Sequence, residues 1–322
     1  MRVLITGIGG FAGRHLARLL LSENREVFGT VRRPEAAGVL REAFPQLTGD
    51  RLRVADVTEA EAVARVVAEV QPDAIIHLAG WTFVPDSHAD PAAVFRSNAL
   101  GTLHVFAAVH RHRARCRVVA VGSADAYGLL DPSDLPVRET CAFRPISPYG
   151  ASKAAADLLG HQWSRGYGLD VVRVRPFNHI GPGQRSVFVC PDFAQQIAAI
   201  ERGRWPAEIE VGTLDVVRDF TDVRDVVAAY VAAMDGAEAG EAYNICTGVG
   251  HTVREMLQTL IELGDSSVAI KVVPERVRKT DVPSVIGSFE KLRARTGWTP
   301  RHSLRQTLAD VLAEQRALAN KQ

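Results

Sequence analysis

A chain of 322 residues is longer than a typical single domain and favours two lobes or one large domain with an annex. Its content of 47% hydrophobic and 23% charged residues is ordinary for a globular protein. The net charge of +1 argues against a general nucleic-acid binder, and four scattered cysteines without a Cys-x-x-Cys pair predict neither a metal site nor a disulfide framework. A strand predicted to begin at Arg2 leaves no room for a signal peptide, and no apolar run reaches the ~20 residues that span a bilayer, so we expect a cytoplasmic protein without a membrane partner.

The first predicted elements are a strand, a glycine-rich turn and a helix. An apolar run at 2–5 is followed, at 14–22, by apolar residues at helical spacing. Between them, Gly7, Gly10 and Gly13 form the pattern G-x-x-G-x-x-G. A tight turn needs residues without Cβ, and backbone N–H groups at a helix N-terminus bind a pyrophosphate. The pattern therefore predicts a dinucleotide-binding turn.

The second predicted strand, 26–30, ends without a carboxylate. A chain that selects NAD usually carries an acid at this point, which binds the ribose 2′-hydroxyl. Here the strand is followed by Arg32 and Arg33. Arginine binds phosphate through charge-assisted, often bidentate hydrogen bonds, so this pair favours the 2′-phosphate of NADP(H).

Strands and helices continue to alternate up to residue 174. This alternation predicts a doubly wound α/β domain with a parallel Rossmann sheet, in which ligands bind at the carboxyl ends of the strands. The third strand is expected to place Asp56 and Val57 against adenine. The other strands are expected at 73–80, 117–122 and 169–174, and the helices at 59–70, 98–109 and 147–167. The sheet edge brings together further candidates for cofactor contacts: Phe11, Leu78, Ala79 and Gly80.

After residue 175 the pattern changes to a mixture of helices and short strands. It predicts a smaller, mixed α/β substrate lobe, with one return to the first sheet near Tyr243. The predicted dinucleotide-binding domain is 1–175 plus about 214–247, and the substrate lobe is 176–213 plus 248–322. Helices are expected at 192–202, 223–234, 253–263 and 303–319, and strands at 208–211, 242–246 and 269–273.

Tyr149 and Lys153 are the predicted catalytic pair. They are four residues apart on a predicted helix and therefore share one face. Because an ammonium beside a phenol favours the phenolate, we expect the pKa of Tyr149 to fall from about 10 toward neutrality. Such a group can donate and accept protons near neutral pH. Ser123 ends the fifth strand and reaches the same sheet edge.

A set of motifs occurs in a fixed order along the chain, and together they strongly resemble the extended short-chain dehydrogenase/reductase family. The second half is similar to the nucleotide-sugar-modifying members of that family, above all to GDP-4-keto-6-deoxy-D-mannose reductases, which form GDP-D-rhamnose. The motifs are the glycine pattern, Asp56-Val57, His77-Leu78-Ala79-Gly80, Asn98-x-x-Gly101-Thr102, Ser123, Tyr149-x-x-x-Lys153, and the stretches 175–183, 217–225 and 278–283.

This resemblance implies a role for each matching residue. Tyr149 would be the acid/base, Lys153 would modulate its pKa and bind the nicotinamide ribose, and Ser123 would give the reacting oxygen a second hydrogen bond. The second lobe would hold the nucleotide sugar. Asn178 would contact the sugar nucleotide, while the diphosphate and the nucleotide ribose would be held by Arg218, Arg278 and Asp281.

Three further residues are candidates for the walls of the substrate site. An apolar stretch that ends at Val189 could line the site of the base. Trp81 and Phe83 depart from the smaller or polar side chains expected beside a sugar, which leaves the identity of the sugar open.

The implied reaction is the NADPH-dependent reduction of the 4-keto group of a GDP-4-keto-6-deoxy-hexose, without a metal. A GDP-mannose 4,6-dehydratase is one alternative, because related dehydratases carry a glutamate two residues after the serine or threonine. This chain has the shorter Asp125 at that position, which is a tentative catalytic residue. Residues 34–50 are predicted to form an ordinary helix and loop in place of the arm seen in those dehydratases.

Two other hypotheses about the function stay open. A 4-epimerase commonly holds NAD, which the arginines after the second strand disfavour. A non-catalytic NADP(H)-binding regulator often loses the tyrosine or the lysine, whereas both are present here. In the family, the helices at 98–109 and 148–167 usually form a four-helix interface, so a homodimer is predicted.

Overall fold

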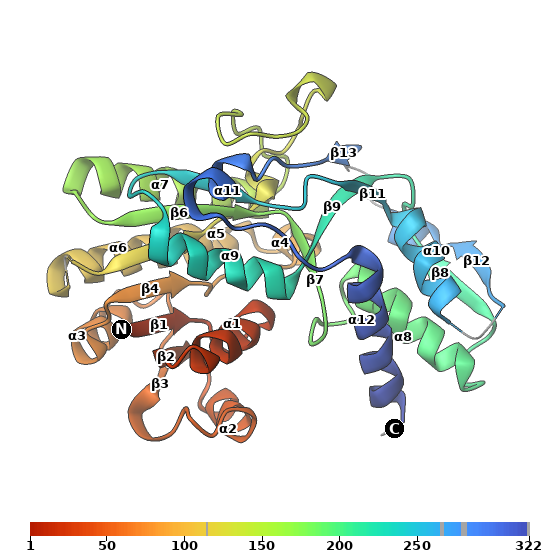
Figure 1. Cartoon of the computed structure of the whole chain (residues 1–322), viewed down its shortest axis with the longest axis horizontal. Coiled ribbons are helices and arrows are strands. Elements are labelled where there is room, and N and C mark those ends of the chain that lie inside the picture. Colours follow the sequence, from red (N-terminus) through yellow and green to blue (C-terminus); the bar gives the residue numbers. More distant parts are fainter. Residues whose placement is uncertain (114, 265–266, 278–281, 321–322) are drawn as a thin grey trace.

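The computed structural model describes residues 1–113, 115–264, 267–277 and 282–320 (Figure 1). Within these residues the main sheet has seven parallel strands in the order β10-β6-β5-β4-β1-β2-β3. The chain reverses direction across the sheet between β1 and β4, where doubly wound folds bind ligands beyond the carboxyl ends of the strands. The predicted Rossmann sheet is confirmed. Its first six strands are β1 (Arg2–Thr6), β2 (Glu26–Val31), β3 (Leu52–Val54), β4 (Ala74–His77), β5 (Arg117–Val121) and β6 (Val171–Pro176).

Helices cover both faces of this sheet, as a parallel sheet requires. Side chains alternate along β1, so Val3 and Ile5 enter one apolar core and Leu4 enters the other. The first core is closed by α1 (Phe11–Ser22), α2 (Pro34–Ala43), α9 (Val223–Gly236) and α11 (Glu290–Thr296). The second core is closed by α3 (Ala60–Val70), α6 (Gly101–His112) and α7 (Pro148–Tyr167).

The helix predicted at 98–109 begins earlier than expected. Asp90 caps it by accepting a 2.9 Å hydrogen bond from the N–H of Ala93, and Pro91 occupies the first position. The run continues through α5 (Pro91–Phe95), one π-helical turn called η2 (Arg96–Leu100), and α6. Its length and mean hydropathy of 1.2 are those of a candidate membrane span, but half of its most apolar window is buried inside the fold.

The chain returns to the main sheet in its second half, as expected. β10 (Ala242–Ile245) pairs with β6, and α9 lies against α1. β9 (Val217–Asp222), by contrast, belongs to the sheet of the second lobe. The exact division of the chain into two domains stays a prediction.

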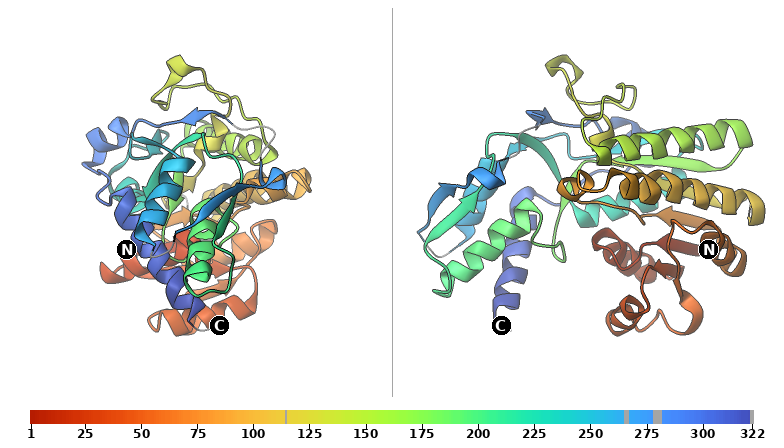
Figure 2. Two further views of the ribbon diagram at one scale, coloured as in Figure 1. Left: turned by 90° about the vertical axis from the view of Figure 1, so that its right-hand side faces the viewer. Right: turned by 180° about the vertical axis from the view of Figure 1, so that it is seen from behind.

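The second lobe lies beside the carboxyl edge of the main sheet (Figures 1 and 2). Its apolar core lies between α8 (Val189–Glu201), α10 (Val253–Leu263) and α12 (Leu304–Ala319). β8 (Glu208–Val211) and β12 (Ala269–Val272) pair in parallel. A further sheet, which the sequence did not predict, is formed by β7 (Asn178–Ile180), β9, β11 (Gly250–Thr252) and β13 (Ser284–Val285).

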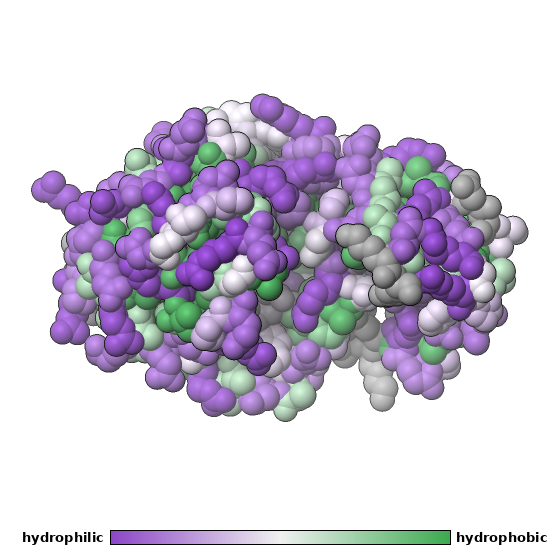
Figure 3. Space-filling view, turned by 90° about the horizontal axis from the view of Figure 1, so that it is seen from below, coloured by the Kyte–Doolittle hydropathy of each residue, from purple (hydrophilic) through white to green (hydrophobic). Residues whose placement is uncertain are grey.

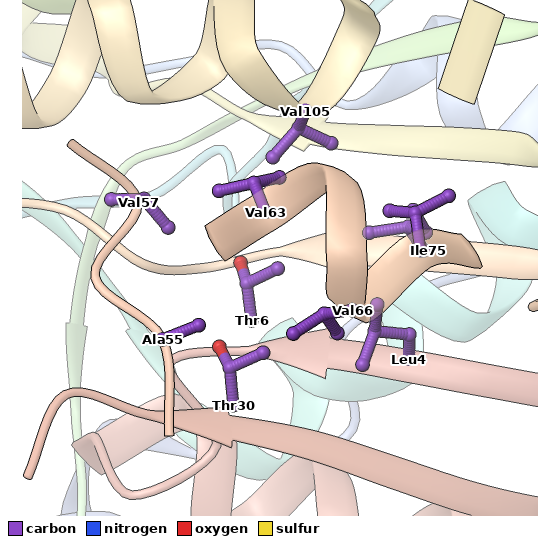
Figure 4. A pocket seen from close by; sticks show the side chains of 10 residues that line it. Leu4, Thr6, Thr30, Ala55, Val57, Val63, Val66, Ile75 and Val105 are labelled. Atoms are coloured by element: carbon purple, nitrogen blue, oxygen red, sulfur yellow. The ribbon is translucent and has the colours of Figure 1, made fainter. Parts of the chain in front are cut away.

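A small apolar cavity lies between the main sheet and α3. Its volume is about 10 Å³, roughly the space that one water molecule needs. Figure 4 shows aliphatic side chains and the two threonines Thr6 and Thr30 around it. The hydroxyl of Thr30 accepts a hydrogen bond from Gly7 N–H, and that of Thr6 accepts one from Ala79 N–H. We regard this cavity as a packing gap of the core.

Candidate active site

A large cleft runs along the carboxyl edge of the main sheet to the second lobe. Its volume is about 1490 Å³. From below, the surface is visibly hollowed between the larger body and the smaller lobe (Figure 3). Among the described site residues that the sequence predicted, Arg33 is the one that does not line this cleft. Arg278 and Asp281 lie outside the described residues. Those that line it are Gly7, Gly10, Phe11, Gly13, Arg32, Asp56, Val57, Leu78, Ala79, Gly80, Trp81, Phe83, Ser123, Asp125, Tyr149, Lys153, Asn178, Val189 and Arg218.

The glycine turn is tightly packed against the end of β4. Gly7 has a φ of 72°, and a Cβ there would lie 2.9 Å from the Cα of Ala79. A Cβ on Gly13 would lie 2.7 Å from the carbonyl oxygens of Gly7 and Ile8. Among the described residues no side chain caps α1, which begins after Gly10. Its first backbone N–H groups can therefore meet an anion in the cleft, which fits the pyrophosphate of a dinucleotide.

The arginines after β2 separate in the structure. Both are exposed, but Arg32 lines the cleft while Arg33 stands at the N-cap position of α2. Arg14, which sequence reasoning missed, also lines the cleft from the first turn of α1. Its place directly after the glycine pattern was the available signal. On the other side, Asp56 accepts hydrogen bonds from both the N–H and the hydroxyl of Thr58.

Tyr149 and Lys153 lie in the first two turns of α7, both about nine-tenths buried. The helix begins there because Ser147 accepts a 3.0 Å hydrogen bond from Gly150 N–H and because Pro148 fits the first position. The ammonium of Lys153 donates a 2.9 Å hydrogen bond to the carbonyl oxygen of Val121 at the end of β5. Burial lowers the pKa of Lys153 to about 8, so it remains mostly charged at neutral pH.

The expected fall in the pKa of Tyr149 is wrong. Burial raises the pKa of this phenol above its usual value, and the nearby charge of Asp125 raises it further, while Ser123 acts in the opposite direction. The spacing of Tyr149 and Lys153 is visible in the sequence, but the depth at which the phenol is buried is not. The consequence is chemical: a tyrosine that stays protonated at neutral pH is suited to donate a proton.

Ser123 and Asp125 form a closed turn after β5. The Ser123 hydroxyl donates to Asp125 Oδ2 over 3.0 Å, and its oxygen accepts from Asp125 N–H over 3.1 Å. The turn therefore holds the hydroxyl of Ser123 beside Tyr149 and places one carboxylate at the same edge.

Asn98 is a second residue whose position the sequence did not predict. It lies in the π-helical turn and is 1% exposed. Its side-chain oxygen accepts a 2.7 Å hydrogen bond from Trp81 N–H, and its amide donates a 2.9 Å bond to Ser152. A Cβ on Gly80 would lie 2.6 Å from the same oxygen and 3.8 Å from Lys153 Nζ. π-turns inside helices are frequent at functional sites, and this one places a buried amide between Trp81, which lines the cleft, and Ser152 on α7.

The sugar side of the cleft joins the two lobes. Asn178 is exposed on β7, and Arg218 on β9 donates to the Val217 carbonyl oxygen. The rings of Phe83 and Phe188 meet edge to face with centroids 5.4 Å apart. In the described part of the chain, no cluster of three His, Cys, Asp or Glu side chains is placed to hold a metal ion.

His179 also lines the cleft. From the sequence it was known only as part of the motif at 175–183, without a role of its own. Its ring stacks on Phe11 with centroids 5.9 Å apart and planes 6° apart, so the start of α1 contacts β7. Burial lowers the pKa of His179, which keeps the ring neutral.

A Rossmann sheet, a glycine turn, and a serine, tyrosine and lysine at one cleft edge define an enzyme of the extended short-chain dehydrogenase/reductase class. The family model described as GDP-mannose 4,6 dehydratase matches residues 4–311, and the chain belongs to that family. The resemblance seen in the sequence is thereby confirmed.

Individual relatives agree with this assignment. The chain is 35% identical to the GDP-6-deoxy-D-mannose reductase of Pseudomonas aeruginosa, over 97% of this chain and 96% of the relative. It is 30% identical to the GDP-6-deoxy-D-talose 4-dehydrogenase of Aggregatibacter actinomycetemcomitans, over 91% and 90%. The solved structure of RMD from Pseudomonas aeruginosa complexed with NADPH is 33% identical, with a TM-score of 0.83 and coverage of 98% and 99%.

Proposed function

We propose that the protein uses NADPH to reduce the 4-keto group of a GDP-4-keto-6-deoxy-hexose, with GDP-D-rhamnose as the product. The observation that carries the proposal is a buried Tyr149 at the same cleft edge as the glycine turn, where burial raises the pKa of its phenol. When bound, NADPH would supply the hydride for C4. The similarity to a reductase and to an NADPH complex supports both the ketone and the cofactor.

The remaining steps, proton donation and stabilisation of the alkoxide, are assigned to four side chains of the cleft. Tyr149 donates the proton that the developing C4 alkoxide takes up. When substrate binds, the Ser123 hydroxyl would turn its one proton from Asp125 Oδ2 to that oxygen and give it a second hydrogen bond. The charge of Lys153 stabilises negative charge nearby. Asp125 holds the Ser123 hydroxyl in place. Its charge also disfavours ionisation of the Tyr149 phenol, so Tyr149 keeps the proton that it donates.

The substrate would lie across the cleft toward the second lobe. Arg218, together with Arg278, would bind the diphosphate, and Asp281 the ribose diol, because these groups need cationic donors and a carboxylate acceptor respectively. Asn178 would contact the sugar nucleotide, and Val189 would border the base. Trp81 and Phe83 give the cleft an apolar wall, which suits a 6-methyl group better than a 6-hydroxyl group.

The choice of cofactor depends on Arg32. We expect Arg32→Ala to weaken NADPH binding by about tenfold to a hundredfold, because a charge-assisted bond to the 2′-phosphate is lost, and to leave NADH binding nearly unchanged. Fluorescence titration of both cofactors measures this. Arg33→Ala is the matched control, and since Arg33 does not line the cleft its effect should be smaller. Equal weakening of NADPH and NADH by Arg32→Ala would contradict the assignment.

A substrate comparison tests the proposed reaction. With GDP-4-keto-6-deoxy-mannose the protein should consume NADPH stoichiometrically, and with GDP-mannose alone it should form no 4-keto product. Dehydration of GDP-mannose with little NADPH oxidation would establish the 4,6-dehydratase instead, for which Asp125 is the available acid/base. NMR of the product distinguishes GDP-D-rhamnose from GDP-6-deoxy-D-talose, which differ at C4.

We further propose that the protein is a cytoplasmic homodimer. Apolar side chains remain exposed on the helices predicted to form the interface, and burying them against a second copy would stabilise the pair. They include Phe95, Leu100, Leu158 and Tyr167, each more than a third exposed.

A further inference from the structure

A chain of hydrogen bonds runs through the buried His77 at the end of β4. The ring is 3% exposed. Its Nδ1 lies 2.7 Å from the hydroxyl of Thr6, and its Nε2 lies 3.2 Å from that of Thr102. Beyond these, the N–H of Ala79 donates to Thr6 over 3.2 Å, and Thr102 donates to the carbonyl oxygen of Asn98 over 2.6 Å.

Burial lowers the pKa of His77, so its ring is neutral, and the two backbone ends of this network then fix the position of every proton in it. A carbonyl oxygen can only accept, so Thr102 gives its one proton to Asn98 and must accept from His77 Nε2–H. A neutral imidazole has one N–H, so Nδ1 is bare and accepts the proton of Thr6. The Thr6 oxygen is then free to accept from Ala79 N–H. The network thus assigns His77 to the neutral Nε2–H tautomer.

Each end of the chain meets a different part of the active site. Ala79 packs on the glycine turn, where a Cβ on Gly7 would clash with its Cα. At the other end, the hydroxyl of Thr102 donates a hydrogen bond to the carbonyl oxygen of Asn98 and helps to stabilise the π-helical turn. The Asn98 amide in turn bonds Ser152, which bonds the carbonyl of Tyr149.

We propose that His77 is a positioning residue, which through Thr6 and Thr102 sets the distance between the cofactor-binding turn and the helix that carries Tyr149. His77 does not line the cleft in which cofactor and substrate would bind. Hydride transfer tolerates little misplacement between the nicotinamide and the proton donor, so loosening this chain should slow the chemical step more than it weakens substrate binding. The kinetic part of the proposal rests on the proposed function.

Thr102 offers the matched pair of variants. Thr102→Val keeps the shape of the side chain and removes the hydroxyl, whereas Thr102→Ser keeps the hydroxyl. We expect Thr102→Val to lower kcat by roughly tenfold or more while KM for the sugar nucleotide changes by less than about twofold, and Thr102→Ser to retain most of the rate. A wild-type kcat in Thr102→Val, or a loss confined to KM, would overturn the proposal.

A second measurement does not depend on turnover. The ¹⁵N NMR spectrum of the wild-type protein should show His77 as the Nε2–H tautomer, without titration between about pH 5 and pH 9, because burial lowers the pKa of its ring to about 3. Thr102→Val should admit the Nδ1–H tautomer, and Thr102→Ser should not. If His77 titrates in this range, or carries its proton on Nδ1 in the wild type, the proposed network of hydrogen bonds is wrong. If the wild type fails to reduce the ketone, the proposed function is wrong. The tautomer of His77 still shows whether this network of hydrogen bonds is present.

Discussion

Replacing Tyr149 with phenylalanine is expected to lower kcat for ketone reduction roughly 10²–10⁴-fold, the usual contribution of a positioned proton donor. The phenol is buried, and phenylalanine fills the same space, so the fold and the cofactor site should be retained. NADPH affinity should change by less than about twofold. Stopped-flow reduction and fluorescence titration of NADPH measure the two quantities.

The same helix provides a control. Tyr167, at the end of α7, is exposed, and its ring packs at a tilt of 31° against Trp163 with ring centroids 4.5 Å apart. Tyr167→Phe keeps this ring contact and should leave both kcat and NADPH binding unchanged. If Tyr149→Phe turns over at the rate of Tyr167→Phe, Tyr149 is not the proton donor.

Asp157→Asn is expected to destabilise the protein by about 3–5 kcal/mol, because it leaves two buried guanidinium groups without their counter-charge. Asp157 on α7 accepts a 2.6 Å bond from Arg173 and bonds of 2.8 and 2.9 Å from Arg175. Arg175 also donates to the hydroxyl of Tyr127 and to the Glu139 carbonyl, so it ties the loop after β5 to β6. Thermal unfolding should show a lower Tm.

An exposed ion pair provides the comparison. Asp215 accepts a 2.8 Å bond from Arg254, and both side chains are more than half exposed. Asp215→Asn should leave Tm nearly unchanged, because solvent screens surface pairs. Equal Tm values for the two variants would show that the charge of Asp157 is not what holds the loop.

The parts of the fold that the sequence predicted correctly are those with strong local patterns. β1, the glycine turn and α1 follow from apolar spacing and from glycines that a Cβ would clash with. The second-lobe sheet was missed because β7, β11 and β13 are two or three residues long and are defined by pairing with β9, far away in sequence. The start of α5 has a local signal in the sequence, Asp90 before Pro91.

The candidate site was predictable in its composition but not in its energetics. Motif order placed Ser123, Tyr149 and Lys153 together, and the structure brings them to one cleft. The pKa of Tyr149 was predicted with the wrong sign, since desolvation depends on packing that spacing does not reveal. The π-turn at Asn98 arises from contacts with Thr102 and with the turn after β4, which no local pattern contains.

The most direct test of the proposed reduction is transfer of deuterium from NADPH labelled at C4 of the nicotinamide, in each of its two stereoisomers, to GDP-4-keto-6-deoxy-mannose. We expect one stereoisomer to place deuterium on C4 of the hexose, detected by NMR of the GDP-6-deoxy-hexose product, with one NADPH oxidised per molecule formed. A product without deuterium at C4, or no product while GDP-mannose is dehydrated without NADPH consumption, would contradict the account.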